Sequence, residues 1–138
     1  MADFKFVRAL NGMTPQTELV TAGGAMEVGD IVIHSSGKVT KAADNPTKAT
    51  LAGLCLGKHQ EDGAAIADGD LVQVLPIGTD AILEGIQKTT ASNPGTEVGI
   101  DLTGTDLSFE AAGNKVGQIF KVIDATARIV QVRMYSQG

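Results

Sequence analysis

Apolar and polar residues alternate along this chain in short runs, and glycine-bearing turns separate the runs. Asp106–Glu110 and Leu71–Leu75 are typical of these runs. No segment sustains the 3.6-residue period of an amphipathic helix, and Gly85 with its β-patterned flanks favours a strand over a helix for Ala81–Ile86. The pattern predicts about ten short strands and therefore an all-β barrel or sandwich.

Three strand-like segments recur later in the chain, in the same order. The matched pairs are Glu27–Val32 with Glu97–Leu102, Leu51–Leu56 with Lys115–Phe120, and Leu71–Val74 with Ile129–Val132. Their separations fall from 70 to 64 to 58 residues, as expected if loops shortened in the second copy. We predict a single β domain over 27–138, built from two diverged copies of a Gly-Asp-strand meander. Repeat 1 covers about 27–78 and repeat 2 about 97–138.

Period-2 alternation within these strands predicts which side chains face the core. It places Val72 and Val74 on one face of their strand and Gln73 on the other. The residues predicted to point inward are Ile31, Ile33, Leu54, Leu56, Val72, Val74, Ile119, Val130 and Val132.

Residues 1–26 lie outside the matched segments and have two interpretations. An alternating run begins at Phe4, Asn11-Gly12 and Pro15 interrupt it, and it resumes at Glu18–Thr21. The segment is either an extended N-terminal arm that reaches a neighbour or the first strand pair of the core.

Composition limits the classes of partner. A net charge of −5 and a pI near 4.8 argue against nucleic acid, whose backbone requires a basic face. Hydrophobic residues make up 43% of the chain, with 17 glycines in addition, and only 20% of residues are charged. Such a chain has little polar material to cover its surface, so we expect part of that surface to rest on protein, including copies of itself. No apolar run approaches the length of a membrane span, so we expect a soluble protein.

Cys55 and His59 are the first candidates for chemistry, because residues four apart share a face of a helix and could bind zinc. Gly53 and Gly57 argue against a helix there, and only the distant His34 could add a nitrogen ligand. A Cys-His nucleophile is equally unsupported, because an apolar strand would raise the thiol pKa. We therefore predict a buried cysteine, a solvated loop histidine and no metal site.

Two acidic clusters, Glu61-Asp62 and Asp68-Gly69-Asp70, suggest calcium but do not fit the spacing of an Asp-rich calcium loop. Turn carboxylates are the better interpretation, because Asp and Gly both favour turns. Gly78-Thr79-Asp80 and Gly104-Thr105-Asp106 lack the lysine of a phosphate-binding loop. The sequence thus predicts no catalytic residue, no cofactor and no enzyme activity.

The arrangement of the strand motifs resembles the small β-rich head-decoration, or cement, proteins of tailed bacteriophages. The resemblance covers roughly residues 20–135 and does not include 1–19. It rests on the segments Val28–Val32, Leu51–Leu56, Gly69–Val74, Ile82–Ile86, Val116–Phe120 and Val130–Met134. It implies a structural virion protein made in the host cytoplasm. Such a protein binds the capsid exterior as a symmetric oligomer and stabilises the head by bridging neighbouring major capsid protein subunits.

The resemblance supplies no catalytic residues, and the residue pattern leaves dimer and trimer open. The N-terminal segment is the candidate for partner contact, because its apolar side chains are not needed by the repeats and its cations could pair with shell carboxylates. The contact residues expected are Phe4, Lys5, Phe6, Val7 and Arg8. The alternative is that the two phenylalanines fill the core. A ligand-binding β-barrel module for sugar or peptide is the other functional interpretation, although aromatic residues are scarce.

Overall fold

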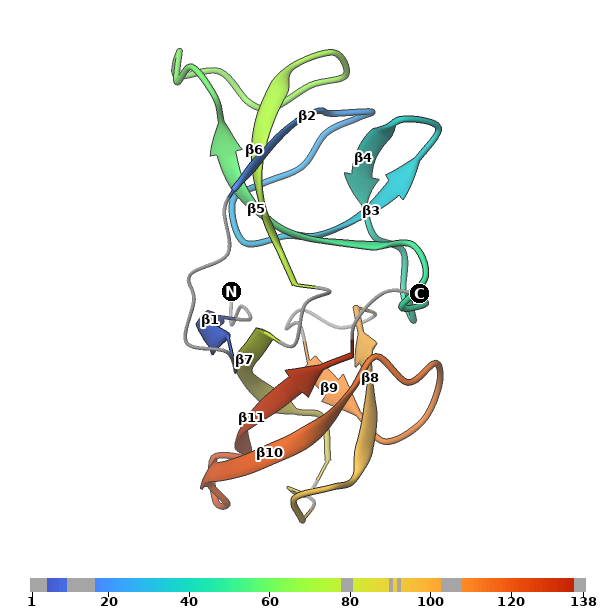
Figure 1. Cartoon of the computed structure of the whole chain (residues 1–138). Helices are drawn as coiled ribbons and strands as arrows, with labels where there is room; N and C mark the ends of the chain where they lie inside the picture. The colour runs from blue at the N-terminus through green and yellow to red at the C-terminus, as the bar shows by residue number, and fades with distance from the viewer. Residues whose placement is uncertain are drawn as a thin grey trace.

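The computed structural model describes residues 5–9, 17–77, 81–89, 91, 93–102 and 108–135, with 5–9 described as backbone alone. Over these residues the chain is all-β, as predicted, and the strands form two sheets placed end to end (Figure 1). The strands are β1 (Lys5–Ala9), β2 (Glu18–Thr21), β3 (Ile31–Ser35), β4 (Lys38–Lys41), β5 (Leu51–Lys58), β6 (Leu71–Pro76), β7 (Ala81–Gln87), β8 (Glu97–Asp101), β9 (Ser108–Glu110), β10 (Gly117–Asp124) and β11 (Ile129–Met134).

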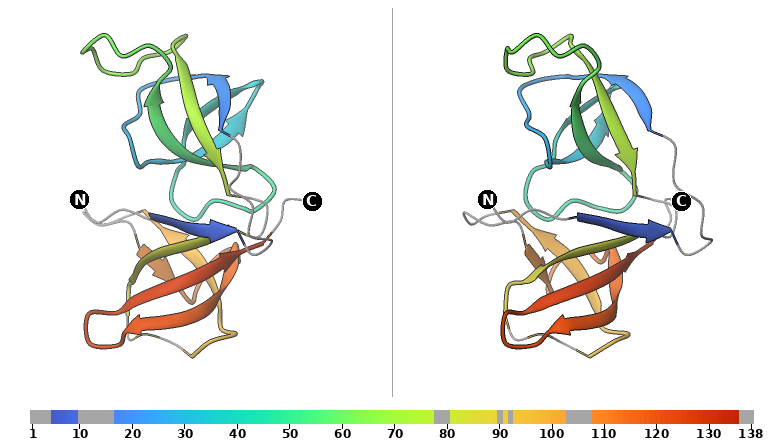
Figure 2. Two further views of the ribbon diagram at one scale, coloured as in Figure 1. Left: turned by 60° about the vertical axis from the view of Figure 1, so that its left-hand side comes forward. Right: turned by 90° about the vertical axis from the view of Figure 1, so that its left-hand side faces the viewer.

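Both sheets curl back on themselves (Figure 2). The first has the order β2-β6-β5-β3-β4, and a parallel bridge between Ala22 and Val39 joins its two ends. The second has the order β1-β7-β11-β10-β8-β9, and a parallel pairing of β7 with β9 closes five of its strands into a barrel. The sixth strand, β1, lies antiparallel to β7 outside that ring.

The two sheets are built in the same way, strand for strand. Strands β7 to β11 pair in the order of β2 to β6, with the first and third strands of each set meeting in parallel. Individual hydrogen bonds recur as well. The Gly29 N–H donates to the Cys55 carbonyl at 2.8 Å, and the Gly95 N–H donates to the Ile119 carbonyl at 2.7 Å. We call residues 17–77 the first copy and residues 81–135 the second copy.

The later two sequence matches are confirmed in register. Cys55 lies opposite Val74 in the first copy, and Ile119 lies opposite Val132 in the second. Immediately after each of these positions the pairing shifts by one residue, which leaves a bulge at Leu56 and at Phe120. Duplication of a bulge at corresponding positions shows that the copies share detailed geometry and not only a general pattern.

The first sequence match is correct in its strands but wrong in its register by four residues. It pairs Gly29 with Gly99, whereas the hydrogen bonds pair Gly29 with Gly95. Both of these glycines have a φ of 94°, a left-handed backbone that glycine adopts without strain. Gly99 lies within β8 and has no such φ. The Asn93-Pro94-Gly95 turn therefore belongs to the second copy.

Each copy also begins one strand earlier than the matched segments. β2 is the counterpart of β7, so Glu18–Thr21 belongs to the first copy although it precedes residue 27. The two predicted N-terminal strands both exist, but they pair in different sheets and not with each other.

The core prediction holds for most of the residues named. Seven of them are buried, and Ile33 is half-buried against the core: the buried ones are Ile31, Leu54, Val72, Val74, Ile119, Val130 and Val132. The prediction is wrong for Leu56, which is 41% exposed. The bulge at Leu56 inserts one residue into the strand, and strict alternation fails at such a point.

One apolar cluster extends across the junction between the copies. Ile31, Leu51 and Ile77 of the first copy belong to the same buried cluster as Phe109 and Val132 of the second. A second buried cluster, which includes Cys55, lies within the first copy. The two copies are therefore held together by apolar packing.

The segment between β4 and β5 adds polar contacts at this junction. The Asn114 N–H donates to Asn45 Oδ1 at 2.7 Å, and Asn114 Nδ2 donates to the Asn45 carbonyl at 2.9 Å. The Leu102 N–H donates to Asp44 Oδ1 at 2.8 Å. Asn45 has a φ of 59°, which Asn tolerates better than most residues. These contacts fix one copy against the other.

Candidate functional site

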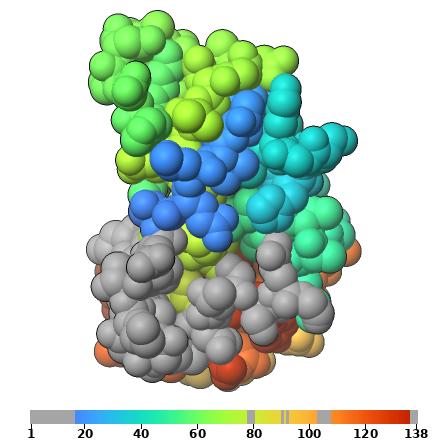
Figure 3. Space-filling view, turned by 45° about the horizontal axis from the view of Figure 1, so that its top comes forward, coloured from blue at the N-terminus to red at the C-terminus, as the bar shows by residue number. Residues whose placement is uncertain are grey.

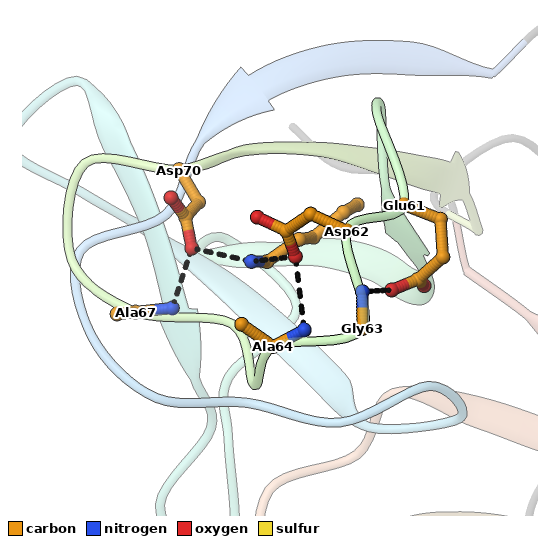
Figure 4. Close-up of polar contacts among 7 residues, drawn as sticks. Glu61, Asp62, Gly63, Ala64, Ala67 and Asp70 are labelled. Carbon is orange, nitrogen blue, oxygen red and sulfur yellow. Dashed lines mark hydrogen bonds and ion pairs between the residues drawn. The ribbon is translucent and has the colours of Figure 1, made fainter.

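A cluster of polar side chains lies at the end of the first copy, in the 59–70 segment that joins β5 to β6 (Figure 4). Lys58, the last residue of β5, sends its Nζ to Asp62 Oδ1 at 2.8 Å and to Asp70 Oδ2 at 3.5 Å. The Lys58 side chain is only 7% exposed. Its hydrogen bond to Asp62 raises the pKa of Lys58 and lowers the pKa of Asp62.

The acidic residues of this segment also cap its backbone turns. Glu61 Oε1 accepts from the Gly63 N–H at 2.8 Å, and Asp62 Oδ1 accepts from the Ala64 N–H at 3.0 Å. Asp70 Oδ2 accepts from the Ala67 N–H at 2.9 Å. The prediction of turn carboxylates is confirmed.

The Gly-Asp motif now has a physical explanation. Asp30 repeats what Asp70 does, because its Oδ2 accepts from the Glu27 N–H at 2.8 Å. The preceding residues Gly29 and Gly69 share a φ of 94°. In each motif glycine supplies the positive φ of a tight turn, and aspartate closes the turn immediately before a strand begins.

A pocket of about 330 Å³ adjoins the Lys58 cluster. It is lined by Lys58–Gln60, Asp62 and Gly69–Leu71. The corresponding connection in the second copy is the short turn after β10, in which the Arg128 N–H donates to the Ala125 carbonyl. The pocket therefore belongs to the longer 59–70 segment and has no counterpart in that turn.

Cys55 and His59, the cysteine and histidine candidates, lie in different environments. Cys55 is fully buried in β5, and burial raises the pKa of its thiol. His59 is exposed in the segment after that strand. The predicted buried cysteine and solvated loop histidine are thus confirmed. Within the described ranges, no group of three His, Cys, Asp or Glu side chains could hold a metal ion.

The predicted partner-contact residues are placed only in part. Phe4 lies outside the described residues, as do Gly78-Thr79-Asp80 and Gly104-Thr105-Asp106. The backbone of Lys5, Phe6 and Arg8 pairs with β7, and Val7 lies at the register shift between Phe6 and Arg8. This segment is an edge strand of the second sheet.

Two exposed apolar side chains are not apparent from the sequence pattern. Leu56 and Phe120 occupy the duplicated bulge, and they are 41% and 39% exposed. Val28, on the turn before β3, is 67% exposed. The matched segments Leu51–Leu56 and Lys115–Phe120 do end on these two residues, but only the paired strands reveal the bulges that turn both outward.

No helix among the described residues is long and apolar enough to cross a membrane. No known protein-family model matches the chain, and no curated protein matches it either.

Proposed function

We propose that this protein is a structural virion protein that binds the outer surface of a phage capsid. In this role it stabilises the head by bridging neighbouring major capsid protein subunits, without cofactor or catalysis. The observation that carries the proposal is the duplication: two copies of one small β unit, joined by a shared core, each exposing an apolar residue at the same bulge. Two matching apolar positions of this kind suit a target that is itself repeated, as the subunits of a shell are.

Bridging stabilises the assembled shell through mass action. A protein that binds two neighbouring subunits has its complete site only on the assembled shell, so binding stabilises assembly over dissociation. The second contact is intramolecular once the first has formed, and its effective concentration can reach the millimolar range. Two weak footprints thereby give firm attachment. Low charge and high apolar content support further contacts between copies of the protein, as a dimer or a trimer, on the capsid exterior.

The test is to mix purified protein with undecorated particles and to measure bound copies by single-particle reconstruction and particle melting by calorimetry. We expect near-stoichiometric decoration, contact between bound copies and a higher melting temperature. Leu56→Ser and Phe120→Ser should each weaken decoration, and the double variant should lose it. Leu71→Ser is the matched control, because Leu71 is 48% exposed but does not lie at a bulge. Decoration by the double variant equal to that of the original protein would exclude these footprints, and absence of decoration by the original protein would exclude the function.

The N-terminal strand remains a proposed second contact, through Phe4, Lys5, Phe6, Val7 and Arg8. Because the backbone of β1 pairs with β7, deletion of the segment would also remove a strand of the second sheet. Charge reversal at Lys5 and Arg8 tests the contact while keeping that pairing. Weaker decoration by the reversed variant supports the contact, and unchanged decoration refutes it.

The pocket beside Lys58 favours a second function, recognition of a small polar ligand such as a sugar or peptide terminus. Lys58→Met would remove its cation while keeping most of the side-chain length. A sugar or peptide that binds the original protein and not this variant would support a ligand-binding module. Equal binding by both proteins would exclude this pocket as the site.

A further inference from the structure

Among the described strands, the duplication leaves one backbone edge paired in the second copy and unpaired in the first. In the second copy, β7 pairs with β11 on one side, and on the other it pairs with β9 at Ile86 and Gln87. Beyond β9, the same side of β7 pairs with β1 over Ala81–Glu84. The strand β1 thus occupies the part of the edge that β9 does not reach.

The corresponding edge of β2 has no partner among the described strands. β2 pairs with β6 over Glu18–Thr21, and its other side meets β4 only next to the strand, at Ala22. In the matched registers, Leu19 lies opposite Gln73 as Glu84 lies opposite Gln131. Leu19 is therefore the counterpart of Glu84, whose partner on the outer edge is Lys5.

The alternation of hydrogen bonds shows which backbone groups face outward. The Ala22 N–H donates to the Asp70 carbonyl on the β6 side at 2.7 Å. In an antiparallel pair, alternate residues turn their N–H and C=O toward the partner strand, so Val20 and Glu18 also face β6. Leu19 consequently presents its N–H and C=O to the open edge, where an extended segment can bind them.

The side chains at this edge indicate the chemistry of the occupant. Glu18 is exposed, whereas its counterpart Leu83 is fully buried and lies opposite Phe6 of β1. Leu19 is 52% exposed, and β2 contains no cation. In Figure 3 the blue segment that includes β2 lies on the surface of the first copy. An acidic side chain beside an exposed leucine favours a strand in which a basic and an apolar residue are adjacent, as Lys5 and Phe6 are.

We propose that the open edge of β2 binds an extended basic and apolar segment of a partner protein, antiparallel to β2 and centred on Leu19. The β1 strand of a second copy is the poorer occupant, because the same strand cannot fill the β7 edge as well. Pairing of two β2 edges would place two acidic chains together without a basic strand between them. The identity of the partner as the shell protein rests on the proposed function, whereas the pairing itself can be tested on purified protein alone.

The probe is a synthetic peptide with the sequence of Phe4–Leu10, added to ¹⁵N-labelled protein and followed by NMR and amide exchange. In free protein the Leu19 amide should exchange rapidly and the Val20 amide slowly. The peptide should shift the signals of Glu18–Val20 and should slow exchange at Leu19. A Leu19 amide already protected in the monomer overturns the inference, as does a peptide that shifts only Ala81–Glu84. Protection that grows with protein concentration and dimer formation also overturns it, because a second copy then occupies the edge.

Two substitutions at Leu19 distinguish the contribution of the backbone N–H to peptide binding from that of the side chain. Leu19→Pro removes the outward N–H and leaves the bonds to β6, so it should weaken peptide binding about tenfold or more. Leu19→Ala keeps the N–H and should bind the peptide more tightly than Leu19→Pro does. Circular dichroism checks that both variants fold. If Leu19→Pro fails to fold, the exchange measurement on the original protein decides. A peptide with glutamate in place of Lys5 and Arg8 should bind more weakly, and equal binding by it refutes the basic character of the occupant.

The same variants separate this inference from the function. If the original protein decorates particles and Leu19→Pro decorates them equally well, the shell protein is not the partner of this edge, and that assignment fails while the function stands. If the original protein decorates nothing, the proposed function fails, and the peptide measurements still decide whether the edge binds an extended segment.

Discussion

Gly53 and Gly117 occupy the same place in the two copies, opposite Val32 and Val98 respectively. A Cβ at Gly117 would lie 2.5 Å from the Arg133 carbonyl oxygen, and a Cβ at Gly53 would collide with the Leu75 backbone in the same way. Because backbone cannot move aside as a side-chain end can, both positions require glycine.

Gly117→Ala should therefore lower the free energy of unfolding by about 1–3 kcal/mol, as overpacking does. Gly24→Ala is the matched control, because no heavy atom lies within 4 Å of its Cβ position and its φ is not in the left-handed range. The control should change stability by no more than about 0.5 kcal/mol. Urea denaturation measures both, and equal stability of the two variants would contradict the close approach.

The environment of Tyr135 gives a second prediction for a single residue, because it changes the pKa of the phenol. Burial, followed by the hydrogen bond that its hydroxyl donates to Glu97 Oε2 at 2.5 Å, raises the pKa of Tyr135 to about 12. It is the chain's single tyrosine, so phenolate absorbance can be assigned to it. The absorbance should rise with a midpoint near pH 12 in native protein, and Glu97→Gln should lower that midpoint. A native midpoint at the ordinary value of 10.0 would exclude the interaction.

The raised pKa of Tyr135 makes the stability of the fold depend on pH. The folded state holds the phenolic proton more tightly than the unfolded chain does. The contribution to stability is therefore complete below pH 10 and is lost as the pH rises toward 12. Burial raises the pKa of the Cys55 thiol as well, so both groups favour the folded state less as alkalinity increases.

At the scale of elements, the segment between β4 and β5 connects the two copies through Asn45. Asn45→Ala removes the acceptor of the Asn114 N–H and places alanine at a φ of 59°. We expect a loss of about 1–3 kcal/mol, the cost of an unpaired polar group together with backbone strain. Asn45→Asp keeps an acceptor oxygen and tolerates the same φ, so it should retain more stability than alanine does. Thermal unfolding of both variants measures the difference, and equal losses would refute the role of the side-chain oxygen.

The strands themselves could be predicted from the sequence, whereas some of their relationships could not. Alternation and Gly-Asp turns locate most strands because both signals are local. The equivalence of β2 and β7 is invisible, because Glu18, Leu19, Val20 and Thr21 match Leu83, Glu84, Gly85 and Ile86 at no position. Only the hydrogen-bond ladders relate these two strands.

Some features of the candidate sites could likewise be predicted from local sequence, and others could not. The turn role of Asp70 follows from local sequence, because Asp and Gly favour turns wherever they occur. Its ion pair with Lys58 does not, because that contact exists only after the 59–70 segment folds back. The outward orientation of Leu56 and Phe120 depends on bulges, which are a property of two paired strands and not of one.

At the scale of the whole molecule, the shared core predicts a single unfolding transition. The buried cluster that holds Ile31, Leu51 and Ile77 together with Phe109 and Val132 is divided if either copy opens alone. We expect far-ultraviolet circular dichroism and Tyr135 fluorescence to give coincident urea transitions, since packing across the junction couples the copies. Two separated transitions would show that each copy unfolds independently. Leu51→Ala, which removes apolar volume at the junction, should shift both signals together.

The connection from β5 to β6 is longer than the corresponding connection from β10 to β11, and this difference has a consequence for engineering. The 59–70 segment lies at the end of the first copy away from the junction, and Ala64 and Ala65 within it are exposed (Figure 1). Loop-closure entropy rises only slowly with length, so a foreign epitope inserted between these two alanines should cost little stability. The same insertion in the tight Ala125–Arg128 turn should cost more, because Arg128 holds a φ of 61° there. Melting temperatures of the two insertion variants would check this expectation. If the protein coats particles as proposed, the first site would carry a displayed peptide in many copies on each particle.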